Sequence, residues 1–356
     1  MKPTFHSLKI AEVRQECADA ISIAFDIPGN LKEAFKFQPG QHLTLKAKVN
    51  GEELRRSYSI CSAPQDQEIR VAIKKVNGGA FSTWANQNLK ASDTIEVMTP
   101  DGKFGIPAGK GKGKSYVAFA AGSGITPILS MIKTTLTQEP GSQFTLVYGN
   151  RRQGTTMFQE TLEDLKNKFL TRFTLLNVYS AEEQEVPIFN GRLDQAKVAE
   201  FIDKLIPVDS IDEAFICGPG AMIDDVEKCL LDKGVKADNI HLERFGVPTE
   251  KSNTAALTQG DAPQAKVTVI MDGLKREMEF HKGDPSILDV AIKHGMDLPF
   301  SCKGGVCCTC RAKVLCGEVR MDKNFSLEPE DVKAGYVLTC QAHPVSEEVI
   351  VSFDDR

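Results

Sequence analysis

Residues 302–310 of this 356-residue chain read Cys-Lys-Gly-Gly-Val-Cys-Cys-Thr-Cys, and a further cysteine follows at Cys340. Cys302, Cys307, Cys310 and Cys340 have the spacing C-x4-C-x2-C with a distant fourth member, which is typical of a [2Fe–2S] cluster. Thiolates are soft, anionic ligands that suit two iron ions bridged by sulfide. The glycines between the first two cysteines let the backbone approach such a cluster closely. The spacing therefore predicts an electron-carrying domain that begins before residue 302.

A zinc site and unpaired structural thiols are the two alternatives for these cysteines. Zinc sites usually combine two C-x2-C pairs, whereas this chain has only one such pair. Cys308 and Cys316 do not fit the cluster spacing, so both are expected to be spare thiols. Cys308 nevertheless leaves a minor alternative ligand set open.

Composition and charge are those of an ordinary globular protein with two or three domains. Hydrophobic residues make up 41% of the chain and charged residues 26%. A net charge of −5, without a run of Lys and Arg, argues against a nucleic-acid partner. No run of about 18 apolar residues predicts a membrane span, and the first residues lack the features of a signal peptide. We therefore expect a cytoplasmic protein with reduced thiols.

Strand and turn signals divide the chain into segments. Residues 5 to about 107 alternate short strands with turns, including a two-residue hairpin turn at Asn50-Gly51, which predicts a small antiparallel barrel. From Lys114 onward, buried-strand candidates alternate with helical stretches, a pattern typical of a parallel α/β sheet. Residues 247–265 are rich in Pro, Thr, Ser, Asn and Ala and predict a linker. The remaining residues carry strands, a helix at 286–294 and the cysteine loop.

Two motifs in the barrel segment suit a flavin nucleotide. They comprise Arg56, Ser57, Tyr58, Ser59, Gly78, Gly79 and Ser82. The arginine can neutralise a pyrophosphate, the tyrosine ring can lie against an isoalloxazine, and a serine hydroxyl can bond flavin N5. The glycines precede a predicted helix, whose N-terminal N–H groups attract anions. Each motif alone also fits an ordinary strand, or a turn with an N-cap at Ser82; together they predict FAD.

The α/β segment has two strand ends suited to a nicotinamide nucleotide. The first, residues 122–127, reads Gly-Ser-Gly-Ile-Thr-Pro, so Pro127 replaces the third glycine of the Rossmann fingerprint. We expect Gly122, Gly124 and Thr126 to shape a pyrophosphate loop. The second strand end, Cys217-Gly218, should lie beside it at the carboxyl edge of the sheet. Cys217 is therefore expected to approach the nicotinamide, although a small buried core residue is the alternative.

Two further segments bear on nucleotide binding. Arg151 and Arg152 follow the strand at 144–148 with no acid beside them, which favours NADPH over NADH, the alternative being two solvated arginines. Residues 109–115 read Gly-Lys-Gly-Lys-Gly-Lys-Ser, but Ala108 stands where a P-loop needs its first glycine. This segment also precedes its strand, so we expect a solvated connection between domains.

Together these motifs resemble the ferredoxin–NADP⁺ reductase superfamily with a plant-type ferredoxin fused at the C-terminus, over essentially the whole chain. Longer runs are similar to reductase subunits of ring-1,2-phenylacetyl-CoA epoxidases. These runs are GEELRRSYSIC (51–61), SQFTLVYGNR (142–151), DEAFICGPGAM (212–222), HLERF (241–245), SCKGGVC (301–307) and SLEPEDVKAGYVLTCQA (326–342). The superfamily motifs are specific for cofactors, whereas only the longer runs point to this system. Relatives commonly have a small residue where this chain has Cys308.

The resemblance implies roles for individual residues. Arg56, Tyr58 and Ser59 would hold FAD, with Gly79 and Ser82 near its pyrophosphate. NADPH would be bound by Gly122, Thr126, Arg151 and Cys217. Phe245, at the end of the reductase part, would cover the flavin. We therefore expect Ser59, Cys217 and Phe245 to be the residues nearest the chemistry.

The expected fold is multidomain, α+β and α/β. It consists of an antiparallel flavin-binding β-barrel at 1–110, a parallel α/β nicotinamide-binding domain at 111–246, a linker at 247–265 and a β-grasp ferredoxin domain at 266–356. The expected electron order is NADPH, FAD, [2Fe–2S], and then the oxygenase subunits of a separate di-iron epoxidase acting on phenylacetyl-CoA. Two alternatives are a reductase for another Rieske or di-iron oxygenase and, from another class, a non-catalytic redox sensor.

Overall fold

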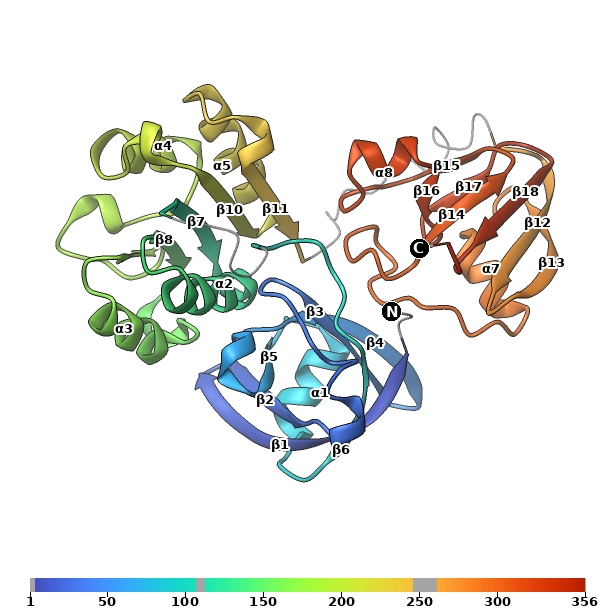
Figure 1. Cartoon of the computed structure of the whole chain (residues 1–356), viewed down its shortest axis with the longest axis horizontal. Coiled ribbons are helices and arrows are strands. Elements are labelled where there is room, and N and C mark those ends of the chain that lie inside the picture. Colours follow the sequence, from blue (N-terminus) through green and yellow to red (C-terminus); the bar gives the residue numbers. More distant parts are fainter. Residues whose placement is uncertain (1–3, 107–112, 246–260, 356) are drawn as a thin grey trace. The chain divides into compact units, whose positions relative to one another are not determined.

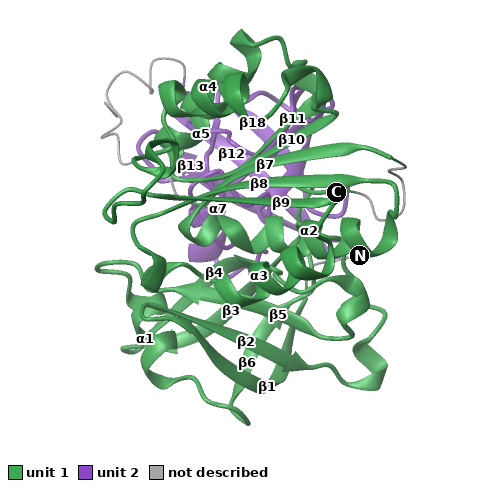
Figure 2. Cartoon of the chain, turned by 90° about the vertical axis from the view of Figure 1, so that its left-hand side faces the viewer, with its two compact units in different colours: residues 1–245 green, residues 246–356 purple. Residues whose placement is uncertain are grey.

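The computed structural model describes residues 4–106, 113–245 and 261–355 (Figure 1). The chain divides into two compact units, residues 1–245 and residues 246–356 (Figure 2). Most of the predicted linker at 247–265, and residues 109–112 of the Gly/Lys-rich segment, lie outside the described residues. No helix in the described ranges is long and apolar enough to cross a membrane.

The first part of unit 1 is a six-stranded antiparallel sheet that curls into a half-barrel, as predicted. Its strand order is β4-β3-β6-β1-β2-β5, and an isolated bridge between Ile60 and Val71 links the two ends of the sheet. The elements are β1 (Phe5–Cys17), β2 (Ala20–Asp26), β3 (His42–Val49), β4 (Glu52–Ser59), β5 (Ile69–Lys74), α1 (Ala80–Asn88) and β6 (Thr94–Met98). Buried side chains such as Leu8, Leu43 and Val97 fill its interior.

The predicted hairpin turn sets the register of the flavin-motif strand. Asn50 and Gly51 have φ angles of 52° and 88°, the left-handed values that a two-residue hairpin turn requires. Val49 pairs with Glu52, and this register continues along the hairpin until His42 pairs with Ser59. A slip of one residue would turn every side chain of β4 to the opposite face. The turn therefore decides which face of the sheet each residue of the flavin motif occupies.

The second part of unit 1 is the predicted parallel α/β domain. Its sheet has the order β11-β10-β7-β8-β9, with α2 and α3 packed on one face and α4 and α5 on the other. The elements are β7 (Ser115–Ala121), α2 (Ile125–Gln138), β8 (Gln143–Asn150), α3 (Gln159–Lys168), β9 (Phe173–Tyr179), α4 (Gln195–Lys204), β10 (Glu213–Gly218), α5 (Gly220–Asp232) and β11 (Ile240–Arg244). The chain leaves β7 first toward β8 and later returns to β10, so the carboxyl ends of β7 and β10 border the crevice where such sheets bind ligands.

The barrel and the parallel sheet share one hydrophobic core within unit 1. Ala20, Cys61 and Ala72 of the barrel belong to the same buried cluster as the side chains of β7 and α2. At this contact the hydroxyl of Ser130 donates a hydrogen bond of 2.6 Å to the carbonyl of Ser62, and both residues are fully buried. The two parts are therefore held together by packing as well as by the chain.

Unit 2 is a small mixed sheet that wraps around one helix, which confirms the predicted β-grasp domain. The main sheet has the order β13-β12-β18-β14-β16, and β15 pairs with β17. The elements are β12 (Gln264–Met271), β13 (Leu274–His281), α7 (Ile287–Lys293), β14 (Arg311–Cys316), β15 (Val319–Met321), α8 (Pro329–Lys333), β16 (Tyr336–Leu338), β17 (Ala342–Pro344) and β18 (Glu348–Ser352). The predicted helix at 286–294 is α7, and the Ser286 hydroxyl caps it by accepting from Asp289 N at 3.1 Å.

Short 3-10 turns connect these elements. They are η1 (Gly29–Leu31), η2 (Pro64–Asp66), η3 (Gly122–Gly124), η4 (Gln153–Thr155), η5 (Pro187–Phe189), η6 (Val208–Ser210) and η7 (Ala237–Asn239).

The described chain of unit 2 is already packed at Asp261, within the segment predicted as linker. The Asp261 carboxylate pairs with the guanidinium of Arg320, one of the two bonds measuring 2.7 Å. The next residue, Ala262, donates its N–H to Pro344 O at 3.1 Å. Strand β12 then begins at Gln264, two residues before the predicted domain start at 266. Polar composition suggested a linker here, but a paired charge holds these residues to the domain.

Candidate functional site

The four predicted cluster cysteines come together in unit 2. The sulfur of Cys302 contacts those of Cys307 and Cys340, and the sulfur of Cys310 also contacts that of Cys340. Cys302 is half-buried, whereas the other three cysteines are buried. Three of the thiols come from the loop before β14 and the fourth from the turn between β16 and β17. Residues 30 positions apart in the sequence therefore form one sulfur-lined site.

Backbone N–H groups point at these sulfurs. Gly304 N–H donates to Cys302 Sγ at 3.3 Å. Contacts with the thiols of Cys307 and Cys340, followed by hydrogen bonds from backbone N–H groups, lower the pKa of Cys302, while the same contacts raise the pKa of Cys307 and Cys340. Gly305 has φ +77°, and a side chain there would meet the carbonyl of Lys323 at 2.9 Å. The backbone N–H groups thus favour the thiolate of Cys302, which is the ligand form of cysteine.

The donor set fits a two-iron cluster. Each iron of a [2Fe–2S] cluster takes two cysteines and two bridging sulfides, whereas a zinc site with four cysteine ligands needs all four sulfurs around one ion. The four cysteines would hold the cluster as two pairs.

The two additional cysteines of this unit have other surroundings. The thiol of Cys308 donates to the carbonyl of Ser326 at 3.1 Å. Cys308 itself has φ +53°. Cys316 is exposed at the end of β14. That both are spare thiols stays a prediction.

Gln341 is a residue of the cluster loop that the sequence did not reveal. Its side-chain amide donates to the carbonyl of Lys303 at 3.0 Å and to the carbonyl of Cys340 at 2.8 Å. It thereby ties the turn that carries Cys340 to the loop that carries Cys302. An amide next to a ligand has no local signature, because its partners are distant in the chain.

The two flavin motifs of the barrel come together. The ring of Tyr58 on β4 lies 5.8 Å from that of Phe81 on α1, and Phe81 lies 5.6 Å from Trp84. Burial raises the pKa of the Tyr58 phenol, so its hydroxyl stays protonated. The exposed side chain of Arg56 is on the same strand. An aromatic cluster therefore joins β4 to the start of α1, and the same strand carries an exposed cation, two features that suit a flavin nucleotide.

Ser82 shapes the glycine turn before α1 but does not cap the helix. The N-cap of α1 is Gly79, which provides no side-chain cap. The Ser82 hydroxyl accepts from Val76 N at 3.0 Å and donates to Gly79 O at 3.3 Å. The alternative interpretation of Ser82 as an N-cap is therefore wrong. The first turn of α1 has no side chain of its own over its N–H groups, which suits an anion.

Ser59 has a carboxyl neighbour that the sequence did not predict. Its buried hydroxyl donates to Oε2 of Glu243 on β11 at 3.2 Å. Burial raises the pKa of Glu243 to about 8, so this carboxyl keeps its proton at neutral pH. The run HLERF drew attention only to Phe245, whose side chain is 41% exposed at the end of unit 1. A glutamate inside a parallel strand is itself an unusual signal, since such strands are normally apolar.

The predicted pyrophosphate loop lies against the end of β10, as expected from the strand order. Gly122 has φ +54° and Gly124 lies so close to β10 that a Cβ there would be 2.0 Å from Cys217 O. The Thr126 hydroxyl donates to Ser123 O at 3.0 Å and so belongs to the loop itself. At Gly218 a Cβ would be 2.8 Å from the methyl group of Met222, the end of a flexible side chain that can move aside. Close packing therefore requires glycine at Gly124, where the neighbouring atom belongs to the backbone.

Cys217 has a fully buried side chain in this structure. It lies in the core cluster that also contains Phe215 and Ile125. Burial raises the pKa of its thiol well above the ordinary value, so the thiol is neutral. Its carbonyl, by contrast, contacts the glycine loop. That its side chain approaches a nicotinamide stays a prediction.

Arg151 and Arg152 lie exposed at the carboxyl end of β8, where the neighbouring strand adds two polar residues. Ala181 N–H donates to Arg151 O at 2.9 Å, which brings the exposed Ser180 beside the arginines. Glu182 Oε2 accepts from Gln153 N at 2.9 Å, so a carboxylate is held at the same edge. The sequence showed no acid after β8, because this one follows β9. Two cations outnumber one anion here, which still favours a 2′-phosphate.

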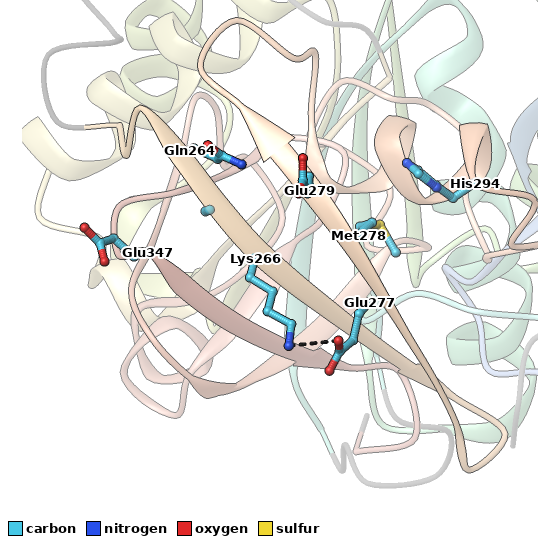
Figure 3. Close-up of a pocket in the computed structure, with 8 residues that line it drawn as sticks. Gln264, Lys266, Glu277, Met278, Glu279, His294 and Glu347 are labelled. Carbon is cyan, nitrogen blue, oxygen red and sulfur yellow. Dashed lines mark ion pairs between the residues drawn. The ribbon is translucent and has the colours of Figure 1, made fainter.

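A shallow pocket lies elsewhere, on the β12–β13 hairpin of unit 2 (Figure 3). Its lining includes Lys266, whose ammonium pairs with Glu277 at 2.8 Å, and the carboxylates of Glu279 and Glu347. None of the predicted cofactor residues lines this pocket.

Three families of domains match the chain in the predicted order. Residues 7–106 match the oxidoreductase FAD-binding domain, residues 119–228 the oxidoreductase NAD-binding domain, and residues 269–345 the 2Fe-2S iron-sulfur cluster binding domain. The predicted FAD, nicotinamide nucleotide and [2Fe–2S] cofactors are thereby confirmed.

Curated relatives resemble the chain over its full length. It is 49% identical over 354 residues to a subunit of the 1,2-phenylacetyl-CoA epoxidase of Escherichia coli K12, covering 99% of both chains. It is 34% identical to the ferredoxin reductase component of 3-ketosteroid-9-alpha-monooxygenase of Rhodococcus rhodochrous, covering 97% of this chain and 96% of that one. Both relatives are components of oxygenase systems by name.

Solved structures share the fold at lower sequence identity. A phthalate dioxygenase reductase covers 98% of both chains with a TM-score of 0.58 and 22% identity. A type IV self-sufficient cytochrome P450 monooxygenase covers 98% of this chain and 41% of that one, with a TM-score of 0.72 and 18% identity. These similarities confirm the predicted fold.

Glu243 should make stability depend on pH. Its unfolded-state pKa is near 4.5 and its folded-state pKa is about 8, so the folded protein binds more protons between these values and loses stability as pH rises. Glu243→Gln should therefore gain stability relative to the wild type from pH 5 to 8, by roughly 2 kcal/mol after allowance for partial exposure. Denaturant unfolding of the FAD-loaded proteins measures the difference. The exposed Glu160→Gln is the control. A stability difference between Glu243→Gln and the wild type that does not change with pH would contradict the raised pKa of Glu243.

Arg151 and Arg152 should decide cofactor preference. The double variant R151A/R152A removes charge-assisted hydrogen bonds to a 2′-phosphate, each contributing roughly 1.5–3 kcal/mol. The kcat/KM for NADPH should fall about tenfold or more, while that for NADH stays nearly unchanged. Steady-state kinetics with ferricyanide measures both, and the exposed Arg14→Ala on β1 controls for loss of charge. Equal losses of kcat/KM with the two nucleotides would show that Arg151 and Arg152 do not bind the 2′-phosphate. Ser180 and Arg192 would then be tested next.

Proposed function

This chain belongs to the family of oxygenase reductases that combine FAD-binding, NAD-binding and 2Fe-2S domains, and on that premise we propose that it supplies electrons to a phenylacetyl-CoA epoxidase. Electrons pass from NADPH to FAD, then to the [2Fe–2S] cluster, and finally to the separate di-iron oxygenase subunits. The observation that carries the proposal is the 49% identity to a component of such an epoxidase across 99% of both chains.

The three cofactors divide the work of electron transfer. NADPH supplies electrons in pairs and an iron–sulfur cluster takes them singly, and flavin chemistry connects the two modes. The chain's residues then bind and orient. Arg56 and the start of α1 neutralise the flavin pyrophosphate, while the glycine loop and the carboxyl end of β10 receive the nicotinamide nucleotide.

The Ser59–Glu243 pair would lie beside the predicted position of flavin N5. The Ser59 hydroxyl donates to Glu243 Oε2 at 3.2 Å, and burial keeps the carboxyl protonated below about pH 8. The pair would therefore present a neutral hydrogen-bonding group, and not a negative charge, to the flavin.

A second candidate acceptor is a different oxygenase. The 34% identity to a ferredoxin reductase component of a 3-ketosteroid monooxygenase supports it. All the cofactor motifs would serve either acceptor, because they lie on the electron pathway and not at a substrate. We favour the epoxidase since the similarity to that reductase is higher over the same length.

The cluster should be separable from flavin reduction. Cys302→Ser or Cys340→Ser removes one sulfur ligand, so visible absorption of the cluster and delivery to the oxygenase should be lost. Ferricyanide reduction, which can draw electrons from the flavin, should largely survive. Cys316→Ser, at an exposed thiol outside the spacing, is the matched control. Loss of ferricyanide activity with the flavin still bound would contradict the electron order.

The acceptor itself can be tested by reconstitution. The purified reductase should support NADPH-dependent oxidation of phenylacetyl-CoA when mixed with the oxygenase subunits of a phenylacetyl-CoA epoxidase. It should give at least tenfold lower turnover with a 3-ketosteroid monooxygenase oxygenase. Product formation is measured by liquid chromatography. Turnover with the 3-ketosteroid oxygenase but not with the epoxidase subunits would contradict the proposal and favour the second candidate acceptor.

A further inference from the structure

One buried hydroxyl ties β8 to the glycine loop at the carboxyl edge of the parallel sheet. Tyr148 is the sixth residue of β8, and its side chain is fully buried. Its hydroxyl donates to the carbonyl of Gly122 at 2.9 Å, in the loop after β7. Burial raises the pKa of this phenol, so the hydroxyl remains a donor at all working pH values.

The bond from Tyr148 restrains the glycine loop at Gly122, where the backbone has a left-handed conformation. Gly122 has φ +54°, a conformation that the backbone adopts readily only at glycine, although no atom lies within 4 Å of a Cβ built there. Gly124, two residues later, is pressed against the carbonyl of Cys217 on β10. The loop is therefore held on one side by close packing and on the other by a hydrogen bond. These two contacts set the direction of the N–H groups that open α2.

We propose that Tyr148 is a positioning residue for the nicotinamide nucleotide, whose hydroxyl holds the Gly122 loop in the shape that receives the pyrophosphate. Tyr148 contacts no ligand itself. Without the hydroxyl, the carbonyl of Gly122 loses its buried partner, and the glycine loop can reorient. The pyrophosphate is common to NADPH and NADH, so both nucleotides depend on this bond equally. The inference rests on the proposed function, because it requires nucleotide binding at this edge.

Tyr148→Phe tests the inference because it removes the hydroxyl and keeps the ring in the core. Its matched control is Tyr116→Phe in the same sheet. The Tyr116 ring is also buried, and its hydroxyl donates to Glu139 Oε2 at 3.1 Å, away from the glycine loop. Both variants lose one buried hydrogen bond and should lose similar thermal stability. Only the first should change nucleotide binding.

The expected result is a rise of about tenfold in the Kd of NADP⁺ and NAD⁺ for Tyr148→Phe, measured by titration calorimetry on the FAD-loaded protein. The KM for both reduced nucleotides should rise by the same factor, while kcat at saturation changes less than twofold. Tyr116→Phe should keep wild-type Kd values. Should Tyr148→Phe not fold, Gly122→Ala serves instead, since the methyl group has space but disfavours φ +54° and should weaken both nucleotides.

Two results would overturn the inference. One is a Kd for Tyr148→Phe equal to that of the wild type or of Tyr116→Phe. The other is a loss confined to NADP⁺, which would place the effect at the 2′-phosphate and not at the pyrophosphate loop. Failure of the wild type to bind either nucleotide would instead contradict the proposed function. The two kinds of failure are therefore distinguishable.

Discussion

The buried contact between the barrel and the parallel sheet is the constraint on which the rest of unit 1 depends. Small side chains of the barrel, Ala20, Cys61 and Ala72, pack into the core of the α/β domain, and the Ser130 hydroxyl bonds the carbonyl of Ser62. Small residues allow two backbones to approach, and a fully buried hydroxyl must be paired, so this contact has little freedom to slide. A flavin on the barrel and a nucleotide on the sheet can exchange electrons only if this spacing is kept.

The same contact brings together groups from opposite ends of unit 1. Ser59 at the end of β4 meets Glu243 on β11, and burial there raises the pKa of the carboxyl to about 8. The carboxyl edge of the sheet is organised in a related way, because Tyr148 of β8 and the Cys217 carbonyl of β10 restrain the glycine loop from the two strands that flank β7. The site of unit 2 depends instead on four thiols and on the backbone N–H groups beside them.

Much of the fold and half of the site could be predicted because their signals are local. The turn at Asn50-Gly51, the cap at Ser286 and the cysteine spacing each act within a few residues, and the structure has the hairpin, helix and sulfur-lined site they predict. Glu182 and Gln341 could not be predicted, since each acts on a loop that is distant in sequence. Composition could not separate residues 261–265 from the linker, because the ion pair between Asp261 and Arg320 that holds them to unit 2 joins distant positions.

The sequence by itself determined the types of domain, their order and the cofactors, because glycine turns, strand alternation and thiolate spacing are short-range requirements of backbone geometry and metal chemistry. Only the tertiary structure decided the environment of each group. It protonated Glu243 by burial, enclosed Cys217 in the core and paired the hydroxyl of Tyr148 with the carbonyl of Gly122. Desolvation and hydrogen bonding between distant segments depend on which residues become neighbours, and that is settled only when the chain packs.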